Sequence, residues 1–189
     1  MPANIMREPG DLAQMKAFFQ DWDPLLKSVL NQVKTVQKWK LSHLDPLDTW
    51  TRGAVALMGD ACHPTLPYQA QGAAMAVEDG ETIACLLGLL AMRGQPEPED
   101  VVRVLRVYEK LRKARTELNV QGAERARVML HLPAGPELEA RDQLMRIWDW
   151  DDVGATSDWP YFDAEYGRKL MSFDAEAEAS RAFAEEFRV

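Results

Sequence analysis

One stretch of this 189-residue chain, residues 55–79, combines the residue types needed to hold a polar cofactor. A short apolar run, 54–58, is expected to be a buried strand and ends at Gly59-Asp60. A carboxylate at the end of a strand can accept hydrogen bonds from ligand hydroxyl groups. Pro67 stiffens the loop that follows and removes one backbone donor. These positions predict a polar ligand held where the strand ends.

The residues after this loop favour close contact with a flat ligand. Small side chains would let a ring approach the backbone, and they stand at Ala70, Gly72, Ala73 and Ala74. The first N–H groups of a helix have no partner within it and point toward an electron-rich or anionic group. A strand, an acidic turn, a fixed loop and a helix N-terminus therefore follow one another in an order that suits a bound cofactor.

These residues also follow a family pattern, which is Gly-Asp-Ala-x-His, a few residues, Pro, Gly/Ala-Gln-Gly, and a small-residue helix that ends in Glu-Asp. The matching positions are Gly59, Asp60, Ala61, His63, Pro67, Ala70, Gln71, Gly72, Glu78 and Asp79. The stretch strongly resembles the second flavin-binding motif of FAD-dependent aromatic-ring hydroxylases, the single-component flavoprotein monooxygenases, and especially their salicylate-hydroxylase-like members. The similarity extends over roughly residues 10–130, through Phe19-x-x-Trp22-x-Pro24, Trp39-x-Leu41, Trp50-x-x-Gly53, Tyr108-Glu109 and Arg112-x-x-Arg115.

The resemblance implies a role for each part of the motif. Asp60 would hold the ribityl hydroxyl groups of FAD, and the backbone of Pro67 would lie near the reactive edge of the flavin ring. Backbone N–H groups would face the pyrimidine end of the ring, where reduced flavin carries negative charge that a helix N-terminus favours. The candidate cofactor-binding residues are Gly59, Asp60, Pro67, Ala70, Gln71, Gly72 and Ala73. No catalytic residue is assigned.

The implied function is the FAD-binding portion of a flavin-dependent monooxygenase. Such an enzyme hydroxylates a small aromatic or related conjugated substrate with NAD(P)H and O2 as co-substrates. The alternative is a non-catalytic helical remnant, or an interaction module derived from such an enzyme. The sequence leaves the oligomeric state open.

The chain departs from the family at its glycines. The family begins with a strand and a Gly-x-Gly-x-x-Gly turn around the FAD pyrophosphate, followed about 20 residues later by an acidic residue on the ribose. This chain has 11 glycines and no Gly-x-Gly arrangement. The middle Asp-Gly motif of the family is also missing, because Asp79-Gly80 lies in the wrong setting. We therefore expect only the C-terminal half, with the N-terminal Rossmann part missing.

The expected fold is α/β by family, of the para-hydroxybenzoate-hydroxylase-like FAD/NAD(P)-binding type, but mostly α-helical in this chain with one or two short strands. Residues 1–50 would end a substrate domain, 51–131 would form the C-terminal part of the FAD-binding domain, and 132–189 a helical, aromatic tail. The longest helices are expected at about 70–92 and 99–130, the second kinked near Gly122. The first would pack through one stripe, formed by Ala76, Gly80, Ile83, Ala84, Leu87 and Ala91.

Other polar groups have a structural interpretation that we favour over a chemical one. Asp60, Cys62 and His63 could be imagined as metal ligands, but no Cys or His pair has zinc spacing, so no metal is assigned. His63 is expected to cap its loop or bond to backbone, and Cys62 to be small and buried. Tyr68 could touch a flavin or substrate, or pack on the surface.

The same preference applies to the charged groups of the two long helices. Glu78 and Asp79 point to different helix faces and are expected to be solvated or to support the helix. The basic cluster at 110–115 is expected to be solvated or salt-bridged, rather than a phosphate site. The Trp-rich segment 148–163 is expected to lie across the surface, anchored by its rings.

Composition narrows the class of protein. Lysine and arginine number 22 against 30 aspartate and glutamate, a net charge of −8, which disfavours nucleic-acid binding. No apolar run approaches the roughly 20 residues of a membrane span, and the N-terminus lacks the apolar core of a signal peptide. The expected location is therefore cytoplasmic, and two cysteines imply no disulfide framework.

Overall fold

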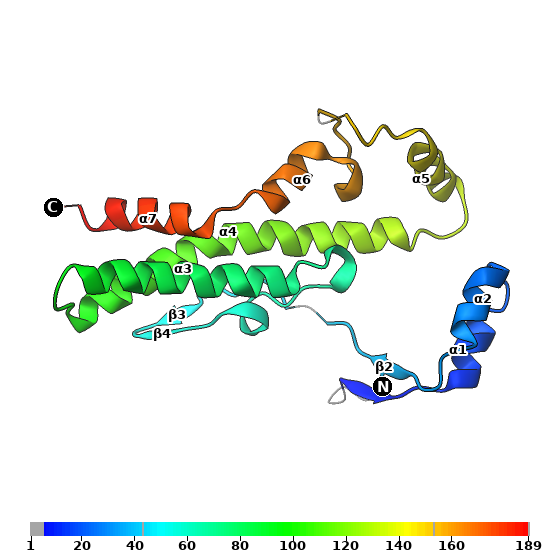
Figure 1. Ribbon diagram of the computed structural model, residues 1–189, viewed down its shortest axis with the longest axis horizontal. Coiled ribbons are helices and arrows are strands. Elements are labelled where there is room, and N and C mark those ends of the chain that lie inside the picture. The colour runs from blue at the N-terminus through cyan, green and yellow to red at the C-terminus, as the bar shows by residue number, and fades with distance from the viewer. Residues whose placement is uncertain (1–5, 43, 153, 189) are drawn as a thin grey trace. The chain divides into compact units, whose positions relative to one another are not determined.

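A computed structural model describes residues 6–42, 44–152 and 154–188, in two compact units, Met1–Ser42 and His43–Val189 (Figure 1). The first unit holds the antiparallel strands β1 (Arg7–Pro9) and β2 (Gln37–Trp39), with helices α1 (Leu12–Phe18) and α2 (Pro24–Leu30) between them in sequence. Aspartates begin both helices: Asp11 accepts from the N–H groups of the first turn of α1, and Asp23 does so for α2.

The second unit is mostly helical. Its hairpin pairs β3 (Thr51–Arg52) with β4 (Val55–Ala56), and two short 3-10 turns follow, η1 (Gly59–Ala61) and η2 (Pro67–Gln69). The long helices are α3 (Gly72–Met92) and α4 (Pro98–Leu130), which lie side by side (Figure 1). The chain then forms α5 (Pro136–Ile147), the turn η3 (Pro160–Phe162), α6 (Ala164–Met171) and α7 (Ala175–Glu186).

The core of this unit lies where α7 packs on α3 and α4. Its buried side chains include Leu86 and Leu90 of α3, Val104 and Tyr108 of α4, and Phe183 of α7. The fold therefore fixes the relative positions of α3 and α4 through the last helix of the chain.

The prediction of a buried strand at 54–58 is wrong for this structure. Only Val55–Ala56 form a strand, and the side chains of Val55, Leu57 and Met58 are exposed. The apolar run belongs to a two-stranded hairpin, in which Ala56 packs against the core while most of its neighbours stay exposed.

The predicted packing stripe of α3 is only partly confirmed, since Ile83 packs against the core and Ala76 lies close to Gly59. Ala84, Leu87 and Ala91 are exposed, whereas the helix buries Met75, Asp79, Thr82, Leu86 and Leu90. Two of the inward residues are polar, so hydrophobic periodicity alone does not identify the whole buried face. They are satisfied locally or across the interface: Thr82 Oγ1 donates to the Glu78 carbonyl at 2.7 Å, and Asp79 accepts three hydrogen bonds.

Helix α4 is one continuous helix through Gly122. The glycine lets a side chain cross the helix. A Cβ at this position would overlap the Tyr166 hydroxyl, and would lie 2.6 Å from Cζ of Tyr166 and 2.9 Å from Oε1 of Gln69. Within the part of the chain that the structure describes, no helix is both long enough and apolar enough to cross a membrane.

Candidate cofactor-binding site

The turn after β4 depends on a glycine. Gly59 is buried with φ +58°, and a Cβ there would lie 3.3 Å from Cβ of Ala76 on α3. Its N–H donates to Oδ2 of Asp79 at 2.9 Å. The positive φ and the close helix together explain why glycine precedes the acidic residue.

Asp60 lies next to this anchored glycine and has the opposite environment. It is exposed and makes no hydrogen bond or ion pair with any described residue. A carboxylate on a fixed backbone, with its oxygens open to solvent, can accept hydrogen bonds from the hydroxyl groups of a ligand. This is the chemistry expected of Asp60.

The loop before α3 holds a strained residue. Pro67 is exposed at the start of η2, and Ala70 ends that turn with φ 54° and ψ 30°. Ala70 is the one non-glycine residue with positive φ in the described part of the chain. The left-handed conformation costs about 1–2 kcal/mol for a residue with a Cβ, so the surrounding structure must hold this turn in place.

The N-terminus of α3 is uncapped. Gln71 occupies the N-cap without a side-chain hydrogen bond to the helix, and the next residues, Gly72 to Ala74, carry almost no side chain. A Cβ at Gly72 would lie 3.4 Å from Cγ2 of Thr65, so the loop passes close to the helix start. The first-turn N–H groups are therefore accessible donors beside small residues.

These groups fit the flavin end of FAD. The donor set is an open carboxylate for hydroxyl groups, an uncapped helix N-terminus for an electron-rich ring edge, and small exposed residues, Ala73 and Ala74, where a flat ring can approach. Nothing in the chain supplies the Gly-x-Gly turn for the pyrophosphate.

The Glu-Asp end of the motif, Glu78-Asp79, lies away from this exposed surface. Asp79 is fully buried, and its carboxylate accepts from His63 Nε2 at 2.6 Å and from Arg112 Nε at 2.8 Å, besides the Gly59 N–H. Burial by itself would raise the pKa of Asp79, but these hydrogen bonds outweigh it and hold the pKa below its ordinary value. Asp79 thus fixes the turn that carries Asp60. Sequence reasoning missed this link, although His63 and Asp79 both belong to the family pattern.

The arginines of the basic cluster at 110–115 form buried ion pairs. Of the two expectations for this cluster, solvated or salt-bridged, the second therefore applies to its arginines. Arg112 is fully buried and pairs with Glu78 at 2.7 Å, and Arg115 pairs with the same carboxylate at 2.9 Å. Both guanidinium groups lie over the ring of Phe173, at 4.8 and 4.9 Å from its centre. Glu78 and Asp79 therefore join α3 to α4 rather than facing water.

Cys62, His63 and Asp79 offer ligand atoms within 4.8 Å of one another, and Asp60 is outside this group. Each is already engaged: His63 Nε2 donates to Asp79, Asp79 also accepts from Arg112, and Cys62 Sγ donates to the Gly59 carbonyl at 3.5 Å. Burial raises the pKa of the Cys62 thiol to about 12. The cluster is explained as a hydrogen-bonded support.

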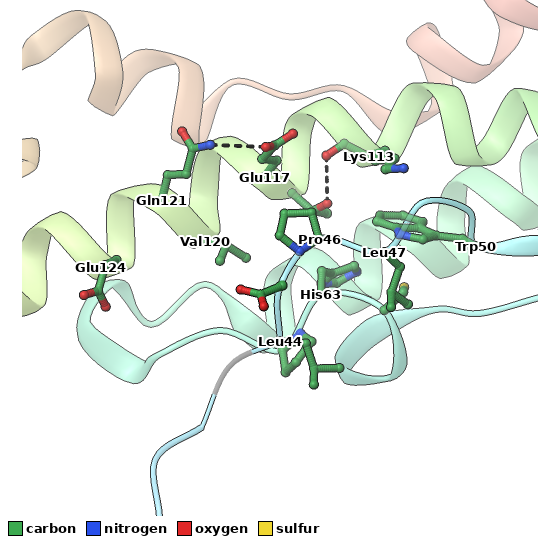
Figure 2. A pocket seen from close by; sticks show the side chains of 14 residues that line it. Leu44, Pro46, Leu47, Trp50, His63, Lys113, Glu117, Val120, Gln121 and Glu124 are labelled. Atoms are coloured by element: carbon green, nitrogen blue, oxygen red, sulfur yellow. Dashed lines mark hydrogen bonds between the residues drawn. The ribbon is translucent and has the colours of Figure 1, made fainter.

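A cavity of about 330 Å³ lies behind the same turn, between the 44–50 segment and α4 (Figure 2). Its walls include Pro46, Leu47, Trp50, His63 and Val120. The Nδ1 atom of His63 has no hydrogen-bond partner among the described residues. None of the candidate cofactor-binding residues lines this cavity, so it is separate from the surface formed by Asp60, Pro67 and the α3 N-terminus.

Comparisons with known proteins identify the family of the chain. A family model described as "FAD binding domain" matches residues 21–123, more than half of the chain. FAD-dependent monooxygenase OpS4 of Beauveria bassiana (strain ARSEF 2860) is 41% identical over 84% of this chain and 36% of its own length. The 3-amino-4-hydroxybenzoate 2-monooxygenase of Streptomyces cremeus is 38% identical over 92% of this chain and 39% of its own length.

A solved structure, a salicylate hydroxylase substrate complex, superimposes with a TM-score of 0.70 at 25% identity, covering 96% of this chain and 40% of that one. The chain thus spans well under half the length of the relatives it matches. The family match, the named relatives and the fold agree, so the chain belongs to the FAD-dependent aromatic-ring hydroxylases, of which it carries part of the FAD binding domain.

Proposed function

We propose that the surface formed by Asp60, Pro67 and the N-terminus of α3 binds the flavin and ribityl parts of FAD. The full cofactor-binding set is Gly59, Asp60, Pro67, Ala70, Gln71, Gly72 and Ala73. The observation that carries the proposal is the contrast between the two aspartates. Asp79 is fully buried and fixed by three donors, whereas Asp60 is exposed and makes no bond to the described protein.

Each part of this surface has a separate task. The Asp60 carboxylate accepts hydrogen bonds from ribityl hydroxyl groups, and the uncapped first turn of α3 donates to the electron-rich end of the flavin. Gly59 and Ala70 set the backbone geometry on either side, both at positive φ. FAD supplies the redox chemistry with NAD(P)H and O2, and the protein orients it and keeps water out.

The proposed reaction is hydroxylation of a small aromatic or related conjugated substrate. The activities named for relatives support this class, since they include a 3-amino-4-hydroxybenzoate 2-monooxygenase and a 6-hydroxynicotinate 3-monooxygenase. In the same scheme residues 1–50 end a substrate domain, 51–131 complete the FAD-binding domain and 132–189 form its helical tail.

A chimera tests the role of Asp60. In this chimera the 189-residue chain replaces the matching region of the Beauveria bassiana relative, and the relative supplies the rest of a full-length enzyme. We expect the chimera to stay yellow through gel filtration, and Asp60→Ala to bind FAD about tenfold or more weakly, since hydrogen bonds to a charged group contribute about 1.5–3 kcal/mol.

Asp21→Ala is the matched control, because Asp21 is an exposed aspartate of the first unit with no bond to a described residue. It should leave the flavin content of the chimera unchanged. A variant Asp60→Ala with the flavin content of the parent chimera contradicts the assigned role.

A further inference from the structure

We propose that a C-terminal clasp, residues 160–171, positions the loop 67–70 and so sets the geometry of the flavin-binding surface. The proposal rests on the proposed function, because this loop is part of that surface. It adds two positioning residues, Tyr161 and Tyr166, which lie far from the flavin motif in sequence.

Both tyrosines donate hydrogen bonds to the loop. The Tyr161 hydroxyl donates to the backbone carbonyl of Tyr68, and the Tyr166 hydroxyl donates to Oε1 of Gln69 at 2.9 Å. These two acceptors are consecutive residues immediately before Ala70. The clasp therefore bonds to the loop just ahead of its strained position.

The path of Tyr166 is fixed by a glycine on α4. Tyr166 is 7% exposed, and a Cβ at Gly122 would overlap its hydroxyl and crowd Gln69 Oε1. Only a residue without a side chain lets the tyrosine ring cross the helix and reach the loop. Gly122, Tyr166 and Gln69 thus form one packed line from α4 through α6 to η2.

The other end of the clasp is tied to α4, and through α4 to α3. Arg115 donates to the carbonyls of Lys169 and Leu170, at 2.5 and 2.7 Å, where α6 ends. The same guanidinium pairs with Glu78 of α3. Phe162 anchors the start of the clasp, since it is 1% exposed and contacts the rings of Trp148 and Trp150.

The clasp explains how Ala70 keeps a left-handed backbone. Such strain persists only where surrounding contacts over-determine the conformation. The loop of η2 is one short 3-10 turn, and its own hydrogen bond is a long one, from the Ala70 N–H to the Pro67 carbonyl at 3.3 Å. The hydrogen bonds from Tyr161 and Tyr166 constrain Tyr68 and Gln69, the two residues that lie between Pro67 and Ala70.

Amide hydrogen exchange of the 189-residue chain tests the clasp without any flavin. We expect Tyr166→Phe to speed exchange in peptides covering 66–74 about fivefold, the size expected for one lost hydrogen bond, with no change in the centres of α3 and α4. Tyr68→Phe is the matched control, because it keeps the Tyr68 carbonyl and changes a hydroxyl in the same loop.

Two variants of Gln69 distinguish a hydrogen bond from packing as the cause of the protection. Gln69→Glu keeps the Oε1 acceptor and should retain protection, whereas Gln69→Leu keeps bulk and should lose it. Equal exchange in Tyr166→Phe and the parent, or a uniform rise across all helices, contradicts a positioning role.

The flavin readout is separate. In the chimera, Tyr166→Phe and Gln69→Leu should shift the visible flavin bands relative to the parent. Gln69→Glu should leave the bands where the parent has them. If the clasp variants change hydrogen exchange but the chimera stays colourless, the proposed function is refuted and the contact between clasp and loop still stands. Flavin bands unchanged in every variant would overturn the link between clasp and flavin surface.

Discussion

At the scale of single residues, adjacent positions divide the work of binding from the work of support. Asp60 is exposed, while its neighbour Gly59 is held by the buried Asp79, twenty residues later. Asp79 neutralises Arg112 and orients His63 at the same time. A carboxylate with three donors and no solvent contact is a structural group, because its lone pairs are already committed.

The lowered pKa of Asp79 predicts the pH dependence of stability. A carboxyl group whose folded pKa lies below its unfolded value, about 3.9, stabilises the fold above that value and loses this contribution as pH falls through the folded pKa. Urea unfolding should therefore show stability falling below about pH 4. Asp79→Asn should lower the free energy of unfolding at neutral pH by about 1–3 kcal/mol, since it weakens the hydrogen bonds from His63 and Arg112 while the ion pair between Arg112 and Glu78 remains.

The variant should also show a flatter loss of stability in acid, because the titrating group is gone. Glu165→Gln removes an exposed carboxylate paired with Lys169 and should change little. Equal stability of Asp79→Asn and the parent at pH 7 would mean that the network contributes nothing to the fold.

At the scale of elements, α4 serves as the common surface on which the other helices are aligned. It packs against α3 and α7, carries the arginines that pair with α3, and offers at Gly122 the gap through which Tyr166 passes. A glycine in a helix interior costs up to about 1 kcal/mol relative to alanine, so its presence here is explained by the crossing side chain.

This crossing predicts a change of sign in a double-mutant cycle. Gly122→Ala should destabilise the parent, because overpacking against Tyr166 costs about 1–3 kcal/mol and exceeds the gain in helix propensity. In a Tyr166→Ala background the ring is absent, and Gly122→Ala should then raise the melting temperature. Thermal unfolding of the four proteins measures this, and an identical effect of Gly122→Ala in both backgrounds would refute the contact.

At the scale of the whole molecule, the proposed flavin surface has no glycine-rich turn beside it to bind the pyrophosphate. The chain has no Gly-x-Gly turn, and apolar groups beside the site, Val55, Leu57 and Val77, are exposed. Half of the dinucleotide therefore has no partner in this chain, and binding energy from one end alone has to offset the loss of ligand freedom.

We therefore predict weak or absent FAD binding by the 189-residue chain alone. Purified protein mixed with FAD should emerge from gel filtration without the visible flavin bands. Stoichiometric, tightly retained FAD would overturn this prediction. A chain that ignores FAD while the chimera binds it would locate the deficit in the missing cradle.

How far the sequence predicts this protein depends on the range of the interaction. Local chemistry was readable: the caps Asp11 and Asp23, the helices on both sides of 93–98, the mostly helical fold and the flavin motif all follow from neighbouring residues. The inward face of α3 was not, because Asp79 is buried by hydrogen bonds to distant residues, Gly59, His63 and Arg112, that periodicity does not reveal.

The sequence by itself determined the family and the order of strand, acidic turn, loop and uncapped helix, because those depend on residue types a few positions apart. The tertiary structure alone decided that Asp79 and Arg112 meet, that Gly122 is a crossing point and that Tyr161 and Tyr166 hold the loop before Ala70. Such contacts join residues from 33 to 97 positions apart, and only packing of the helices brings them within hydrogen-bond distance.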